Sequence, residues 1–245
     1  MIKEKPNRFC IGLLDWYLTY QFRRRFFSVH VDGFDGFDAF FKDAGSFPIL
    51  FYGNHQSWWD GFFAFQLARR YGIDQRVIME EKNLQRFPFF RYVGVFGVDL
   101  DLKEGRAQSL MHCVRTLKVD KPRRALLMYP QGRLVSPLEK AWPPFKPGIE
   151  TILKLCPAVK AVPIIHEIVS GKHQLPEVFI EIGQPISAAN QPDATVLEAA
   201  LKDTREIMIE KVLAGSVPQN GFYLSKPAKH MHGETGSSPR HADAK

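Results

Sequence analysis

The chain has 245 residues, 45% of them hydrophobic, and a formal net charge of +7. This length fits one domain with appendages, and the positive charge favours an anionic partner such as a phosphate group, a membrane surface or a nucleic acid. Because the sequence contains neither an RNP motif nor zinc-finger spacing, we expect an anionic lipid surface as partner and no nucleic acid.

The three cysteines are scattered and show no Cys-x-x-Cys spacing. They predict a reducing compartment, with neither a disulfide framework nor a zinc site. The sequence has no run of about 18 or more apolar residues, so we expect no transmembrane helix. The N-terminus lacks the continuous apolar region of a secretory signal. We therefore expect a peripheral or monotopic protein at the cytoplasmic face of a membrane.

Residues 1–31 are predicted to form an N-terminal membrane-interfacial helical segment. Residues 9–22 are rich in aromatic and aliphatic side chains, and Arg23, Arg24 and Arg25 follow them directly. Trp and Tyr side chains settle at membrane interfaces, where arginines contact anionic headgroups. The composition also suits a first helix that packs on the core with its arginines in solvent, and the two interpretations are compatible.

Apolar strands alternate with helices from residue 47 onwards. Residues 32–46 repeat the tripeptide Asp-Gly-Phe without the acid spacing of an EF-hand, so we expect a turn there. The patterns predict strands at 47–52, 75–79, 93–100, 124–129, 159–165 and 177–182, and helices at 58–70, 103–117, 149–155 and 193–213. Residues 214–245 are predicted to be a disordered tail because Gly, Ser, Pro, Lys and His dominate there. This alternation indicates an α/β fold.

His55 and Asp60 stand where the strand at 47–52 gives way to the helix at 58–70. Ligands of open α/β sheets bind at such strand ends. Ser57-x-x-Asp60 fits a capping box, which places Asp60 in the first helical turn beside the loop that carries His55. A histidine oriented by a carboxylate can take the proton of an attacking hydroxyl near neutral pH. The alternative is that Asp60 only caps the helix and His55 is an ordinary polar residue at a strand end.

Four stretches follow one another in a characteristic order. They are Asn54-His55-x4-Asp60, then Lys82-Asn83-Leu84 with Phe87-Pro88-Phe89-Phe90 and Gly97, then Tyr129-Pro130-Gln131-Gly132-Arg133, and finally Val162-Pro163-Ile164. Their order resembles the sequence blocks of the glycerolipid acyltransferases typified by lysophosphatidic acid acyltransferase (1-acylglycerol-3-phosphate acyltransferase). The resemblance covers about residues 45–185. One block alone is weak evidence for a family, whereas four in order are strong evidence.

The resemblance implies an α/β fold: a single acyltransferase domain at residues 32–213 with a central mixed sheet flanked by helices, preceded by the interfacial helix. The implied activity transfers a fatty acyl group from acyl-CoA or acyl carrier protein to a hydroxyl of a lysophospholipid, as in phospholipid biosynthesis, with no cofactor and no metal. His55 would be the general base and Asp60 would orient it. The substrate-binding residues would be Asn54, Lys82, Gln131, Gly132, Arg133 and Lys146.

The hydroxyl is expected to attack the thioester directly, without an acyl-enzyme. The sequence has no Gly-x-Ser-x-Gly elbow, and none of its cysteines is paired with a nearby histidine and acid. Lys146 precedes the helix at 149–155, close to the positive end of that helix. The sequence thus predicts a base and a set of basic binding groups but no protein nucleophile.

The third block departs from the family's usual Phe-Pro-Glu-Gly-Thr-Arg. Gln131 replaces the glutamate, Arg133 directly follows Gly132, and Leu134 stands at the usual arginine position; the second block also lacks an arginine near Gly97. Because the family arginine is associated with the acceptor's phosphate, these differences favour an acceptor without a phosphate monoester, although the remaining basic side chains could rebuild the phosphate site. The same fold would also suit a thioesterase that uses water as acceptor, or a catalytically silent lipid-binding protein.

Overall fold

The computed structural model describes residues 1–43, 45–99, 103–118, 123–136, 138–139, 141–171, 173–215 and 221–226. The helices are α1 (Arg8–Arg25), α2 (Phe37–Lys42), α3 (Asp60–Arg70), α4 (Glu81–Arg86), α5 (Lys103–Lys118), α6 (Gly148–Leu155) and α7 (Ala194–Leu213), with 3-10 helices η1 (Pro88–Val93) and η2 (Ala188–Asn190). The strands are β1 (Ser28–Gly33), β2 (Ile49–Gly53), β3 (Asp74–Glu80), β4 (Val95–Val98), β5 (Arg124–Met128), β6 (Lys160–Val169), β7 (Glu177–Ile182), β8 (Ile186–Ser187) and β9 (Phe222–Ser225).

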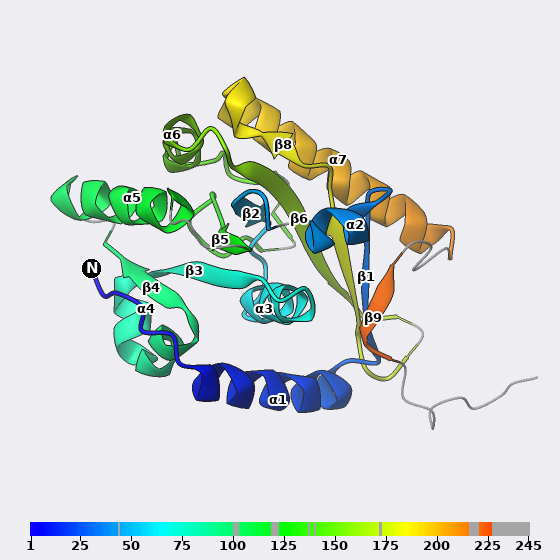
Figure 1. The fold of residues 1–245 in the computed structure, drawn as a ribbon. Coiled ribbons are helices and arrows are strands. Elements are labelled where there is room, and N and C mark those ends of the chain that lie inside the picture. Colours follow the sequence, from blue (N-terminus) through cyan, green and yellow to red (C-terminus); the bar gives the residue numbers. More distant parts are fainter. Residues whose placement is uncertain are drawn as a thin grey trace, which may run out of the picture.

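These strands form one mixed sheet of order β4-β3-β5-β2-β6-β7-β1-β9, with β8 paired to β6 (Figure 1). The five strands from β4 to β6 run parallel to one another, β7 is antiparallel to β6, and β1 is parallel to β7. The carboxyl ends of β3, β5, β2 and β6 therefore meet along the same edge of the sheet. This arrangement confirms the prediction of an α/β fold with a central mixed sheet flanked by helices.

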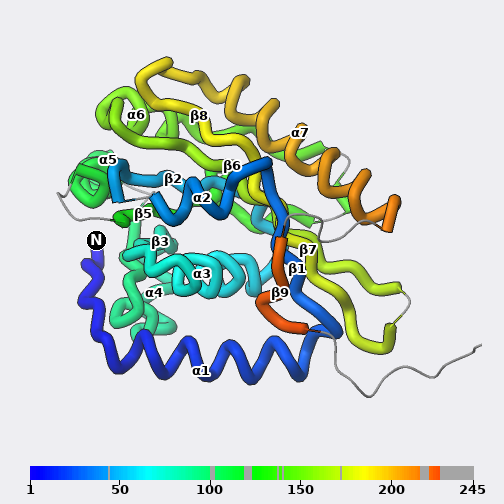
Figure 2. The backbone as a smooth tube through the Cα atoms, turned by 45° about the vertical axis from the view of Figure 1, so that its right-hand side comes forward, coloured from blue at the N-terminus to red at the C-terminus, as the bar shows by residue number. Residues whose placement is uncertain are grey.

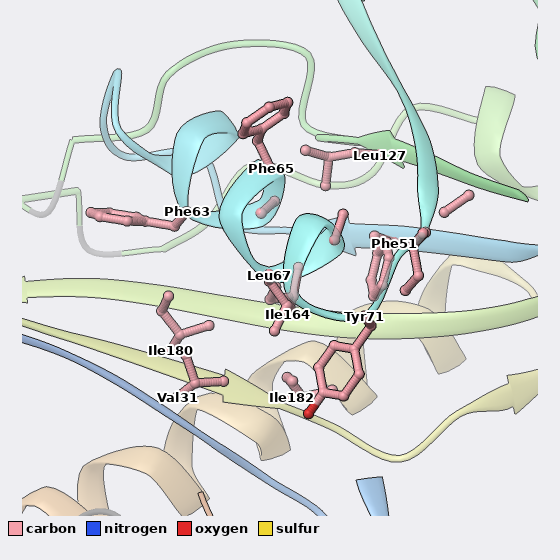
Figure 3. Packing of buried hydrophobic residues seen from close by; sticks show 14 of the residues in the cluster. Val31, Phe51, Phe63, Phe65, Leu67, Tyr71, Leu127, Ile164, Ile180 and Ile182 are labelled. Carbon is pink, nitrogen blue, oxygen red and sulfur yellow. The ribbon is translucent and has the colours of Figure 1, made fainter. Parts of the chain in front are cut away.

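Helices cover both faces of the sheet because β2 and the middle of β5 and β6 carry apolar side chains on both faces. In β2, Ile49 and Phe51 belong to one hydrophobic cluster, whereas Leu50 and Tyr52 belong to the other, as the alternation of side chains along a strand requires. Helices α1 and α3 lie on one side of the sheet, and α5, α6 and α7 lie on the other (Figures 1 and 2). Figure 3 shows how α3 packs into the first cluster, with Leu67 next to Ile164 of β6.

Helix α1 is apolar on two opposite sides. It begins after Asn7, whose side chain accepts hydrogen bonds from the first turn of the helix, as an N-cap does. One side contributes buried residues to the core, namely Leu14, Leu18 and Phe22. At 3.6 residues per turn, the opposite side carries the exposed residues Phe9, Leu13, Trp16, Tyr17 and Tyr20. Within the described ranges, no helix combines the length and apolar composition needed to cross a membrane.

The largest differences from the predicted boundaries concern β1, α2 and β9. Strand β1 crosses the predicted boundary between residues 31 and 32 and pairs with β7, so the N-terminal segment is part of the sheet. Residues 37–42 form α2 in place of a turn, because its phenylalanines are buried in the core. Strand β9 lies in the predicted tail and pairs with β1. Residues 216–220 and 227–245 of that tail lie outside the described residues.

Candidate active site

His55 and Asp60 form a hydrogen-bonded pair at the carboxyl end of β2. Nδ1 of His55 lies 3.0 Å from Oδ2 of Asp60, whose side chain is almost fully buried, whereas the His55 side chain is 28% exposed. A neutral His55 that donates its Nδ1–H to the carboxylate keeps an acceptor lone pair on Nε2. The pair can therefore take a proton from a substrate at the surface and stabilise the imidazolium that results.

The loop between β2 and α3 is shaped by the same carboxylate. Oδ2 of Asp60 also accepts hydrogen bonds from the backbone N–H groups of Gln56 and Ser57, at 2.8 and 2.9 Å. The contact with Ser57 is half of the predicted capping box. The other half is absent from this loop, because Oγ of Ser57 accepts from the N–H of Trp59 and α3 begins at Asp60. Asp60 thus fixes the loop and orients His55, which combines the two roles considered from the sequence.

Asn54 holds the end of β2 against β6. Its Nδ2 donates to the carbonyl of His166 at 2.9 Å, and its Oδ1 accepts from the N–H of His166 at 3.0 Å. The Asn54 side chain is buried, and the two strands approach so closely that a Cβ at Gly53 would collide with the carbonyl oxygen of Ile164. This geometry gives Asn54 a structural role, and its contact with substrate stays a prediction.

Tyr129 and His166 lie close to the dyad; Tyr129 is partly buried with its hydroxyl enclosed, and His166 is buried. The ring of Tyr129 stacks on that of His55, with centroids 4.2 Å apart and an interplanar angle of 10°. Burial raises the pKa of the Tyr129 hydroxyl. His166 is also buried, and burial lowers its pKa to about 4, only partly opposed by the charge of Asp60. Both side chains are therefore neutral near pH 7. They give the dyad an uncharged, poorly solvated environment on this side.

Neither residue was predicted to take part in the site. Tyr129 belongs to the third block, but its position does not reveal that it stacks on His55. His166 extends the apolar strand Val162–Ile165 and shows no other signal in the sequence.

The loop after β5 is tied to the dyad through the backbone. The N–H of Val135 donates to the carbonyl of His55 at 2.6 Å. Gly132 has φ of +70°, and the side chain of Lys146 occupies the space that a Cβ at Gly132 would need. The predicted substrate-binding residues Gly132 and Lys146 are therefore close together, and glycine is required for both the backbone conformation and the contact.

The other predicted binding residues occupy different environments. Gln131 is buried, and neither atom of its amide has a hydrogen-bond partner among the described residues. Arg133 is exposed and forms an ion pair with Glu139. Lys82 is exposed on α4, which packs against β3 and β4. The third block thus lies at the dyad, whereas Lys82 lies on a separate helix. In the described part of the chain, no cluster of His, Cys, Asp and Glu side chains could hold a metal ion.

A family model described as Acyltransferase matches residues 40–167, which is just over half of the chain. The chain belongs to the acyltransferase family. The matched range contains the dyad, the whole third block, Lys146 and His166. The candidate site residues at the carboxyl edge of β2, β5 and β6 therefore lie within the range that matches the family model.

The fold of this acyltransferase is similar to a crystal structure of the 1-acyl-sn-glycerophosphate (LPA) acyltransferase, PlsC, from Thermotoga maritima. The TM-score is 0.54, with 15% sequence identity, and the similarity covers 80% of this chain and 79% of that chain. At this identity the similarity shows the fold alone. A comparison with curated protein sequences gives no match.

Proposed function

We propose that this acyltransferase moves a fatty acyl group from a thioester, acyl-CoA or acyl carrier protein, to a hydroxyl group of a lysophospholipid. The observation that carries the proposal is the His55–Asp60 pair: Nδ1 of His55 is bound to a buried carboxylate, and the ring remains partly exposed. Membership of the acyltransferase family and a fold like that of a lysophosphatidic acid acyltransferase support this class of reaction.

The reaction proceeds in two proton transfers. The acceptor hydroxyl gives its proton to Nε2 of His55 as its oxygen attacks the thioester carbonyl carbon. Asp60 stabilises the imidazolium, and the C–S bond breaks as the ester forms. The imidazolium then returns the proton to the departing thiolate, so the products are a lipid ester and a free thiol. Because the dyad serves both transfers, no covalent acyl-enzyme is required.

The acceptor is a membrane lipid, and α1 has a surface suited to reach it. The exposed side of α1 carries Trp16 (68% exposed) and Tyr20 (47% exposed), and three arginines end the helix. Aromatic side chains with an apolar body and a polar edge bind the headgroup region of a bilayer, and nearby arginines bind anionic lipids. The opposite side of α1 packs on the core, so the helix connects a membrane surface directly to the domain that carries the dyad.

A catalytically silent lipid-binding protein and a thioesterase are the competing functions. Asp60 is buried and accepts three hydrogen bonds, one of them from His55. Neither a lipid-binding scaffold nor the start of a helix needs the bond to His55, so this arrangement favours an enzyme. A panel of lysophospholipids incubated with acyl-CoA distinguishes all three, since thiol release without acceptor indicates a thioesterase and an acylated lipid indicates a transferase.

The decisive experiment compares the wild type with His55→Ala in this panel, using mass spectrometry of the lipid products. Removal of a general base lowers the rate by about 100-fold to 10,000-fold. His173→Ala is the matched control, because His173 stacks on Phe27 and is not part of the dyad. Activity of His55→Ala within threefold of the wild type would reject the mechanism, and the absence of any acylated product with the wild type would reject the function.

A further inference from the structure

Arg133 and Glu139 form a bidentate ion pair in the loop after β5. Nη1 of Arg133 donates to Oε1 of Glu139 at 2.7 Å, and Nη2 donates to Oε2 at 2.6 Å. This hydrogen bonding lowers the pKa of Glu139 to about 2, so the carboxylate is charged near neutral pH. The paired N–H groups of a guanidinium match a carboxylate or a phosphate equally well. Glu139 therefore occupies the two N–H groups of Arg133 that a phosphate would bind.

The ion pair closes a compact turn. Oε1 of Glu139 also accepts from the N–H of Ser136 at 3.1 Å, and Nη1 of Arg133 donates to the carbonyl of Leu134 at 3.2 Å. The exposed side chains of Leu134 and Leu138 project from this turn. Glu139 is thus held in place by the loop itself and is not a freely rotating surface carboxylate.

This turn lies next to the catalytic dyad. Val135, two residues after Arg133, donates its N–H to the carbonyl of His55, and the Lys146 side chain lies against Gly132. With Glu139 bound to Arg133, the N–H groups of Arg133 that match a phosphate are occupied, while the cationic side chain of Lys146 lies against Gly132. A phosphodiester carries one negative charge, whereas a phosphate monoester carries up to two near neutral pH.

We infer that Glu139 is a specificity-determining residue that competes with the acceptor headgroup for Arg133 and disfavours phosphate monoesters relative to phosphodiesters. A phosphate monoester needs a bidentate cation and must displace the carboxylate of Glu139 before it binds. A phosphodiester headgroup carries one charge, which Lys146 can balance while the ion pair remains closed. The inference rests on the proposed function, because the acceptor is a lysophospholipid only if the protein is the lipid acyltransferase proposed above.

The test compares two acceptors with the same acyl chain, lysophosphatidic acid as the monoester and lysophosphatidylglycerol as the diester. Glu139→Gln removes the charge but keeps an oxygen that can accept from Ser136, so the turn is retained. We expect the ratio of kcat/KM for the monoester to that for the diester to rise by about threefold to fivefold, mainly through a lower KM, the size of effect that an exposed ion pair produces. The increase should disappear in the double variant Arg133→Ala/Glu139→Gln.

The control is Asp38→Asn, which neutralises another exposed ion-pair carboxylate, on α2, where Asp38 contacts Lys42. It should leave the ratio at the wild-type value. An unchanged ratio in Glu139→Gln, or an equal loss for both acceptors, would mean that Glu139 only holds the turn and would overturn the inference.

A binding measurement separates this inference from the proposed function. Thermal shifts with sn-glycerol 3-phosphate require no turnover, and Glu139→Gln should respond at a lower ligand concentration than the wild type, but only when Arg133 is present. If no variant acylates either lipid, the proposed function fails while this measurement still decides whether Glu139 competes for Arg133. Equal responses of wild type and Glu139→Gln would refute the competition.

Discussion

Replacement of Asp60 by asparagine should separate the two roles of this carboxylate. Its Oδ2 accepts from Nδ1 of His55 and from the backbone N–H groups of Gln56 and Ser57, at distances between 2.8 and 3.0 Å. Asparagine has nearly the same shape but no charge. Its amide can still accept from the loop, but it no longer fixes the His55 tautomer or stabilises an imidazolium.

The magnitudes follow from these three hydrogen bonds. Loss of the orienting carboxylate should lower kcat by about 1,000-fold, which corresponds to about 4 kcal/mol of transition-state stabilisation. The two backbone contacts change from charged to neutral acceptors, at about 1 kcal/mol each, and the start of α3 loses a favourable charge, about 0.5 kcal/mol. We therefore expect the free energy of unfolding to fall by about 2 to 3 kcal/mol, which lowers Tm by about 5 to 10 °C.

The assay measures kcat well below the melting temperature of the variant and records Tm on the same sample. Asp193→Asn is the matched control, because Asp193 caps α7 through a hydrogen bond from the N–H of Val196 at 2.9 Å. It should lose stability but keep full activity. If Asp60→Asn keeps more than a tenth of the wild-type kcat despite the expected loss in Tm, Asp60 serves only the loop and helix, and the dyad mechanism is refuted.

Two further predictions concern the outer face of α1 and the buried histidine. The double variant Trp16→Ser/Tyr20→Ser should weaken flotation with anionic vesicles by at least about tenfold, since each substitution removes apolar contact area. The control Met111→Ser on α5 should leave flotation unchanged. Equal vesicle binding of the two variants would reject membrane binding through the exposed side of α1. His166 has a pKa of about 4 in the folded protein against an ordinary value of 6.5, so the unfolded state binds the proton first as the pH falls below 6.5, and the resulting loss of stability grows until about pH 4. At pH 5 the loss amounts to about 2 kcal/mol of the free energy of unfolding. The decrease of Tm between pH 7 and pH 5 should therefore be smaller in His166→Gln than in the wild type. An identical decrease in the wild type and the variant would contradict the burial of a neutral His166.

The sequence predicts the centre of the sheet well because its strands are buried on both faces. β2 and the middle of β5 and β6 read as apolar runs, and such runs are found where helices cover both sides. The dyad is equally local, since His55 and Asp60 are five residues apart and the strand-to-helix turn brings them together. Patterns of this kind act over a few residues and need no knowledge of tertiary structure.

The features that were missed depend on the tertiary path of the chain. β9 is a short apolar stretch, Phe222–Ser225, in a tail otherwise rich in Gly, Ser, Pro, Lys and His, and it pairs with the edge strand β1. The Asn54 side chain finds its partner 112 residues away, so the sequence motif that contains it could not separate a structural role from a substrate contact. Arg133 and Glu139 are six residues apart, a spacing that no regular element brings together, and only the tertiary path of the loop creates their ion pair.

The position of β1 in the sheet also determines when the molecule can complete its fold. Ser28 of β1 and Glu177 of β7 are 149 residues apart and in contact, and pairings of such long sequence separation form slowly. During synthesis β1 precedes both of its sheet partners, β7 and β9, and cannot pair until they follow. Until then β1, whose residues are all buried in the finished sheet, remains unpaired, which exposes the nascent chain to aggregation. Chains truncated before residue 177 should therefore be insoluble even though they contain the complete dyad.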